Sequence, residues 1–231
     1  MVTHICQLLH DDLWPQGLGS NPMSVTLKVT ANLNFFVSGS FHGSTEDLCS
    51  ISQLTTHKCT QELTDVLFRR AQQFIQFRLD PESQAARELG FAAISGFLEV
   101  QVTAHVALRA SWQQPVTFMF HSWRMQLICD YRRQILHVCA WFPGSSHNAY
   151  ILTNSQVPHV FGRLQSWLLG GKGHPQKTWL MTPVHHLQCA ADESYNAAHA
   201  STRPMIEQMI SLLRMMFRCL DHSGTVLQYS L

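Results

Sequence analysis

Apolar residues in the first third of the chain recur at helical spacing. Between Cys59 and Ile75 they follow i, i+3 and i+4 intervals, which predicts an amphipathic helix over residues 52–77. Ser52 is placed to cap this helix, because a side-chain oxygen at that position can accept a bond from a free backbone N–H. The other helices expected in this half of the chain cover residues 25–39, a short stretch beginning at 44–47, and residues 82–95 after the Asp80-Pro81 boundary.

The pattern changes beyond Gly96, where β-branched and apolar residues begin to alternate. Residues 98–111 therefore predict a strand. Two further strands follow, and their short connection predicts that they pair in the antiparallel direction. Alternating helices and short apolar runs follow, and their order after the strands suits a three-layer α/β domain. The expected elements are strands at 125–131 and 134–142, a partly helical stretch at 149–164, a short buried strand at 166–171, an extended stretch at 178–184 and an apolar helix at 202–218.

These boundaries divide the chain into three parts. Residues 1–24 contain several prolines and glycines and predict an irregular lead-in. Residues 25–79 predict a helical segment whose short helix, turn and longer helix have the outline of a helix-turn-helix. A plain helical bundle fits this pattern as well, and the pattern alone favours it. Residues 80–231 predict the α/β domain.

Charge and composition narrow the choice of partners only slightly. The 231 residues carry a formal net charge of +1, and charged residues make up 13% of them. Any surface that binds nucleic acid must therefore be local. Lys58, Arg69 and Arg70 lie on the longer predicted helix and are candidates for phosphate contact, although a solvated helix face explains them equally well.

The remaining composition indicates a protein of a reducing compartment. No apolar run approaches the length of a membrane helix, and the first residues do not have the pattern of a secretory signal. The seven cysteines form no CxxC pair, which favours reduced thiols over a disulfide framework or a zinc ribbon. We expect a nuclear and cytoplasmic protein with no membrane partner.

Several short segments, in order and over most of the chain, carry a family resemblance. From about residue 27 onwards the sequence resembles the Harbinger transposase-derived nucleases. The segments that carry this resemblance are SGSF (38–41), AQQFIQF (71–77), HVALRA (105–110), WFPGS (141–145), WLLG (167–170), TWLMTP (178–183), YNAAH (195–199), FRCLD (217–221) and LQYS (227–230).

The resemblance implies an RNase H-like DDE nuclease core preceded by a helix-turn-helix segment. It also implies cleavage of DNA by two divalent metal ions, Mg²⁺ or Mn²⁺, held between two aspartates and a glutamate. A Myb-like DNA-binding protein is the partner that the family resemblance suggests. The family continues beyond its LQYS segment, so the α/β domain is expected to be truncated at its C-terminus.

The resemblance also locates the metal ligands in this chain. In the family the first aspartate lies three residues before a histidine. That histidine is His105 here, so the aspartate position is Val102. The second aspartate ends the family's LLGD motif, and its position here is Gly171. The third ligand is retained as Glu207. Asp130 matches a further acid of the family that is not one of the three principal ligands, and the family's acid in the turn after WFPGS is replaced by Asn148.

Two of the three ligand positions thus lack a donor atom. Glu207 alone would hold a metal ion weakly, even if Asp130 contributed, and the charge of Lys172 opposes a cation next to Gly171. We therefore expect no bound metal and little or no cleavage, with DNA or protein binding as the surviving activity. Two alternatives stay open, namely a metal-dependent DNA endonuclease with residual activity and a degenerate product without a selected function.

Overall fold

The structure is a computed structural model that describes residues 2–14, 23–38, 51–97, 100–113, 120–164 and 166–220, with only the backbone described for 53, 101–113 and 120–123. Two compact units are present, and each is described by itself. The first contains Met1–Phe74, Trp112–Met119 and Arg214–Leu231, and the second contains Ile75–Ser111 and Phe120–Leu213.

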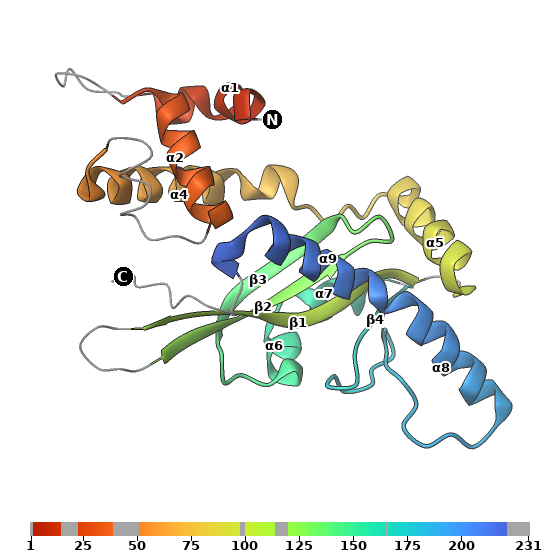
Figure 1. Ribbon diagram of the computed structural model, residues 1–231. Helices are drawn as coiled ribbons and strands as arrows, with labels where there is room; N and C mark the ends of the chain where they lie inside the picture. The colour runs from red at the N-terminus through yellow and green to blue at the C-terminus, as the bar shows by residue number, and fades with distance from the viewer. Residues whose placement is uncertain are drawn as a thin grey trace. The chain divides into compact units, whose positions relative to one another are not determined.

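The first unit is built from α1 (Val2–Leu13), α2 (Val25–Ser38) and α4 (Gln53–Phe74), with the short 3₁₀ helix η1 (Arg218–Leu220) packed against α2. Apolar side chains from all three α-helices form one core, which includes Leu9, Val29 and Leu63. Figure 1 shows these helices in red and orange. The expected cap of α4 is present, because the Ser52 hydroxyl accepts a hydrogen bond of 3.3 Å from the backbone N–H of Thr55.

The expectation of an irregular lead-in is wrong for residues 2–13, which form α1. Leu9 and Leu13 are almost fully buried in the core of the first unit, and Val2, Ile5 and Cys6 pack against the same core. Their spacing of three and four residues is itself the pattern of an amphipathic helix. The prolines and glycines that suggested irregularity begin at Pro15, after the helix has ended, and residues 15–22 lie outside the described part of the chain.

A mixed sheet of order β3-β2-β1-β4-β5 is the centre of the second unit. Its strands are β1 (Val100–Gln113), β2 (Phe120–Cys129), β3 (Ile135–Pro143), β4 (Trp167–Leu169) and β5 (Leu180–Met181). β2 and β3 are antiparallel, whereas β4 runs parallel to β1 on one side and to β5 on the other. The helices of this unit are α5 (Pro81–Ser95), α6 (Asn148–Asn154), α7 (Val157–Phe161), α8 (Ala190–Thr202) and α9 (Pro204–Met216).

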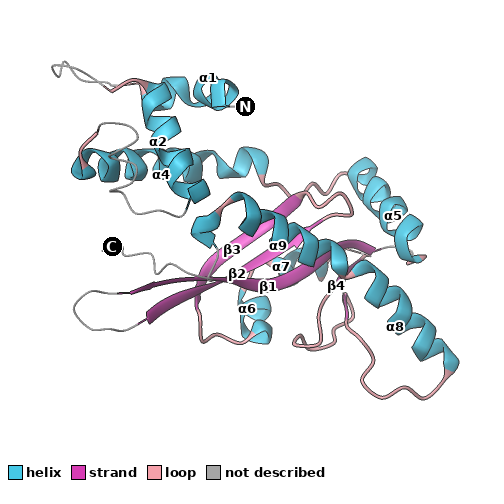
Figure 2. Ribbon diagram, in the orientation of Figure 1, coloured by secondary structure: helices cyan, strands magenta, loops and turns pink. Residues whose placement is uncertain are grey.

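Helices cover both faces of this sheet. Leu168 packs with residues of α6 and α7, including Leu152 and Phe161. The next residue, Leu169, packs on the other face with Phe91 of α5 and Met205 of α9, because successive strand residues point to opposite faces. Figure 2 shows α9 crossing in front of the strands and α7 behind them. The unit therefore has the three layers that the sequence predicts.

The structure confirms the α/β class and most of the expected elements, including the antiparallel pair of β2 and β3. α8 is an exception, since the sequence pattern did not predict a helix over Ala190–Thr202. The short helix expected at 44–47 lies outside the described residues. The helix-turn-helix and the three-part division of the chain consequently stay predictions.

α5 is delimited by its own sequence. Asp80 accepts a hydrogen bond of 2.8 Å from the N–H of Ser83, Pro81 begins the helix, and Gly96 ends it with a positive φ of 72°. These are the residue types that favour helix ends. The buried face of α5 presents Phe91, which is 0% exposed, to the core that includes Val100 and Leu169.

Replacing Phe91 by alanine should lower the free energy of unfolding by about 3–5 kcal/mol, because the lost side chain leaves a cavity in this core. Leu89 provides a matched control on the same helix, because it is 72% exposed. Leu89→Ala should change the free energy of unfolding by less than about 0.5 kcal/mol. Urea denaturation followed by circular dichroism measures both, and equal losses for the two variants would contradict the packing described here.

Candidate functional site

The positions of the two replaced aspartates lie on the central pair of parallel strands. Val102 is in β1, where its Cα is in register with Leu168 of β4. Gly171 follows the last residue of β4, Leu169, by two positions. Because β1 and β4 are adjacent and parallel, the two positions that the sequence resemblance identifies lie on neighbouring strands. Gly171 is roughly 10 Å farther along the strand direction than Val102.

The backbone at Gly171 does not require glycine. A Cβ atom built at this position meets nothing within 4 Å, and no positive φ is found there. The preceding Gly170 is different, because its Cβ would lie 3.0 Å from Leu180 and 3.4 Å from His174. Packing therefore explains why residue 170 is glycine. At position 171, by contrast, an aspartate side chain would fit without a steric conflict.

Glu207, the retained third residue, lies in the first turn of α9. Its Oε1 accepts a hydrogen bond of 2.8 Å from Nε of Arg203, and the two side chains are 49% and 40% exposed. The neighbouring Ile206 is buried, so α9 turns its apolar face to the core and Glu207 to solvent. The carboxylate is therefore neutralised by a guanidinium, in an ion pair that solvent screens strongly.

The residues present do not fit a two-metal centre. Val102 and Gly171 supply no donor atom, and Glu207 is paired with Arg203. In the described part of the chain, no group of three or more His, Cys, Asp or Glu side chains could hold a metal ion. A divalent cation needs several hard oxygen ligands, and this arrangement offers one.

Asp130 lies in the turn between β2 and β3 and is only 6% exposed. Its Oδ1 accepts hydrogen bonds from the N–H groups of Arg132, at 2.9 Å, and Gln134, at 2.8 Å. The adjacent Tyr131 packs in the cluster that contains Val100, the first residue of β1. Asp130 is thus near the start of β1, whereas Gly171 follows the end of β4, roughly 13 Å along the strand direction. The structure does not bring the two positions together.

Asn148, at a further position where the family has an acid, contacts the loop that contains Gly171. Its Oδ1 accepts a hydrogen bond of 3.0 Å from Arg124, which also donates to the Ser146 carbonyl at 2.7 Å. A Cβ at Gly173 would lie 3.2 Å from its side-chain nitrogen. An amide at this position adds no negative charge to the edge of the sheet.

The side chains of α8 hold the strand exits around Gly171, a role that sequence reasoning missed. Tyr195 donates to the Thr182 carbonyl at 2.9 Å, and Asn196 exchanges two hydrogen bonds of 2.9 Å with the backbone of Val184. His199 is 3% exposed, and its Nε2 lies 3.0 Å from the Gly170 carbonyl. The capping box of Cys189 and Asp192 at the start of α8 is the sequence signal that could have revealed this helix.

Burial lowers the pKa of His199 below its ordinary value, although the carbonyls of Gly170 and Met181 oppose the shift. The Nε2 atom must carry the proton that the Gly170 carbonyl accepts. A neutral imidazole therefore links α8 to the residue that precedes Gly171.

The candidate nucleic-acid residues of α4 have different surroundings. Lys58 and Arg69 are exposed, whereas Arg70 forms an ion pair of 2.6 Å with Asp12 and donates to the Leu8 carbonyl at 2.8 Å. Arg70 thus holds α1 against α4. Lys58 and Arg69 stay candidates for phosphate contact. Asp65 lies on the same face of α4 as Arg69 and reduces the positive charge of that face.

His199 should make the fold less stable in acid. A histidine whose pKa is lowered in the folded state binds its proton at a lower pH than it does in the unfolded chain. The free energy of unfolding therefore falls as the pH drops below about 6.5. His137, whose pKa burial also lowers, contributes with the same sign. His199→Gln can still donate to Gly170 but cannot titrate, so its loss of stability between about pH 7.5 and pH 5.5 should be smaller than that of the wild type.

Urea denaturation at each pH provides the measurement, and His186→Gln provides the control because His186 is exposed. The control variant should keep the pH dependence of the wild type. An unchanged pH dependence in His199→Gln would show that His199 is not a buried neutral group.

The chain is similar in sequence to one family of endonucleases and to several individual proteins. The DDE superfamily endonuclease family matches residues 116–231. The chain is 34% identical to "Putative nuclease HARBI1" of Bos taurus and of Homo sapiens, over 99% of this chain and 68% of each relative. It is 33% identical to the Xenopus laevis protein of the same name, over 99% of this chain and 69% of that protein.

No solved structure matches this chain. Within the described residues, no helix is both long and apolar enough to cross a membrane. The family match spans half of the chain, and the relatives match nearly all of it. From these similarities we conclude that the chain belongs to the Harbinger transposase-derived nuclease family.

Proposed function

We propose that this protein is a transposase-derived nuclease relative that no longer cleaves DNA with divalent metals and acts by binding DNA. The observation that carries this proposal is the state of the three ligand positions. Val102 and Gly171 have no donor atom, and the remaining carboxylate of Glu207 is bound to Arg203. One metal ion held by one shared carboxylate would stay mostly hydrated and weakly bound.

An RNase H-like core is part of the proposal. The order β3-β2-β1-β4-β5, with an antiparallel pair on one side and parallel strands on the other, supports it. The position of Gly171 after β4, beside β1, is where such a core would present its second aspartate. The fold can thus keep the DNA-facing surface of a nuclease after its metal ligands have changed.

The charge distribution supports DNA binding. No Asp or Glu occurs between Asp130 and Asp192, whereas five Lys and Arg residues do. These are Arg132, Arg133, Arg163, Lys172 and Lys177. The sequence between the two aspartates contains β3, α6, α7, β4 and β5. A chain with a formal net charge of only +1 therefore includes a long segment whose charged side chains are all basic, and such side chains can contact phosphate.

A Myb-like partner protein and a nuclear and cytoplasmic location complete the proposal. The partner rests on the family resemblance, and the location rests on the sequence composition. The competing function is a metal-dependent endonuclease with residual activity. The two functions differ in whether the wild-type chain nicks DNA with a divalent metal and needs Glu207 to do so.

Restoring both carboxylates should restore metal-dependent nicking. The double variant Val102→Asp/Gly171→Asp supplies two ligands, and the side chain at 171 enters open space. The exposed pair of Arg203 and Glu207 is worth at most about 1 kcal/mol, so bound metal can displace the guanidinium. Nicking of supercoiled plasmid with Mn²⁺ should rise about tenfold or more over the wild type.

The matched control is Val102→Asn/Gly171→Asn, which adds side chains of the same shape without charge and should stay inactive. Adding Glu207→Ala to the aspartate variant should abolish the restored nicking. Metal-dependent nicking by the wild-type chain that is lost in Glu207→Ala would instead establish the residual endonuclease.

A further inference from the structure

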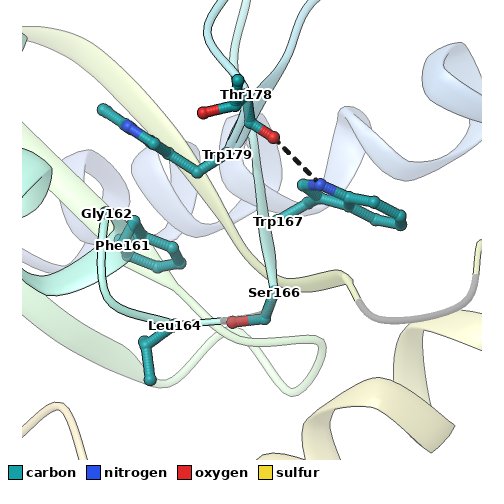
Figure 3. Close-up of a pocket in the computed structure, with 7 residues that line it drawn as sticks. All are labelled: Phe161, Gly162, Leu164, Ser166, Trp167, Thr178 and Trp179. Atoms are coloured by element: carbon teal, nitrogen blue, oxygen red, sulfur yellow. Dashed lines mark hydrogen bonds between the residues drawn. The ribbon is translucent and has the colours of Figure 1, made fainter.

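A cavity of about 370 Å³ lies beside the amino-terminal ends of β4 and β5. Figure 3 shows the side chains around it, which come from the end of α7, the loop before β4 and the residues before β5. β4 runs from this cavity towards Gly171, which is roughly 13 Å farther along the strand direction. The cavity is therefore separate from the former metal site. Its volume is within the range of sites that hold small ligands.

One wall of the cavity is aromatic and held in place. The rings of Phe161 and Trp179 are stacked with their centroids 6.0 Å apart and an angle of 29° between their planes. Phe161 belongs to the core that contains Leu168, and Trp179 packs against that core. The Trp167 indole donates a hydrogen bond of 3.1 Å to the Thr178 carbonyl, which joins the two sides of the cavity. Phe161 is 2% exposed and supports the half-buried Trp179, whose indole is the ring of this pair that a planar group can contact.

Ser166 provides a polar group without a partner. Its residue is 4% exposed, and in the described part of the chain its hydroxyl oxygen has no hydrogen-bond partner. In Figure 3 this oxygen is turned towards the side on which Leu164 and Phe161 lie. A buried hydroxyl without a hydrogen-bond partner is destabilising. A ligand with a hydrogen-bonding edge would remove this destabilisation.

Charge distinguishes the inside of the cavity from its surroundings. Its lining contains no charged side chain. Arg163 lies between the lining residues Gly162 and Leu164, and Lys177 immediately precedes Thr178. Arg163 and Lys177 are exposed, and they belong to the segment without acids that lies between Asp130 and Asp192. An uncharged planar group inside the cavity and an anionic group outside it therefore match the chemistry of both regions.

We propose that this cavity binds an unpaired nucleobase of single-stranded DNA. The base would stack against the aromatic wall and offer its polar edge to Ser166. Arg163 and Lys177 would contact the flanking phosphates. Aromatic stacking combined with a positively charged rim is the physical basis of binding to single strands. This binding needs no metal ion, so it goes beyond the loss of cleavage proposed above.

The test uses the full chain and a single-stranded DNA of twelve nucleotides that carries one 2-aminopurine. A second strand of the same length and charge has an abasic site in place of that base. The affinity for each strand is measured by anisotropy, and stacking is measured by quenching of 2-aminopurine fluorescence. The wild type should bind the base-containing strand about tenfold more tightly than the abasic strand and quench its fluorescence.

Thr178→Phe should remove both the preference and the quenching, because Thr178 is exposed and a ring there fills the cavity from its rim. Gln176→Phe is the matched control, because this exposed residue does not line the cavity; it should behave as the wild type. Circular dichroism and thermal unfolding verify that both variants are folded. Ser166→Ala should weaken binding of the base-containing strand alone.

Equal affinity of the wild type for the two strands would overturn the proposal, as would an unchanged preference in Thr178→Phe. Quenching of tryptophan fluorescence by free adenosine without any preference between the strands would identify a small-molecule site instead. Displacement of bound DNA by a tryptophan-containing peptide, with no preference for the base, would identify a protein-binding site and would also overturn the proposal.

Discussion

Parallel pairing between β1 and β4 is the interaction on which the α/β unit depends. It places Val102 opposite Leu168 and Thr103 opposite Leu169. Since Leu168 and Leu169 pack on opposite faces of the sheet, the short strand β4 joins both helical layers to the centre of the unit. The same pairing fixes where the chain leaves β4, at Gly170. The location of the next residue, Gly171, therefore follows from packing, whichever side chain occupies that position.

Packing and chemistry are separable in this fold. The residues that stabilise the unit, such as Phe91 and Leu168, lie in the cores. Gly171 adjoins open space, and Glu207 is exposed. Substitutions at Gly171 and Glu207 would therefore change the chemistry of this region without a large cost in packing. A fold of this kind can change its chemistry and keep its surfaces, which is the condition for a role that depends on binding.

The sequence predicted the elements with the clearest periodicity, because helix α4 and strands β1 to β3 carry regular apolar spacing and α5 has its own caps. It missed α1 and α8. Helix α1 was missed although Ile5, Leu9 and Leu13 have helical spacing, because the prolines and glycines that begin at Pro15 indicated an irregular segment. The site positions came from the family resemblance, whereas the ion pair of Glu207 with Arg203, the turn bonds of Asp130 and the contacts of His199 needed coordinates. The cavity beside Trp179 combines segments whose proximity depends on the tertiary fold.

Isothermal titration calorimetry with Mn²⁺ tests the central claim most directly, because it measures metal binding without requiring cleavage. Wild-type protein should give only heats of dilution, since Glu207 is the one carboxylate retained at the three ligand positions. A specific binding event in the micromolar range that disappears in Glu207→Ala would contradict the account, because it would mean that a metal centre persists without Asp side chains at positions 102 and 171.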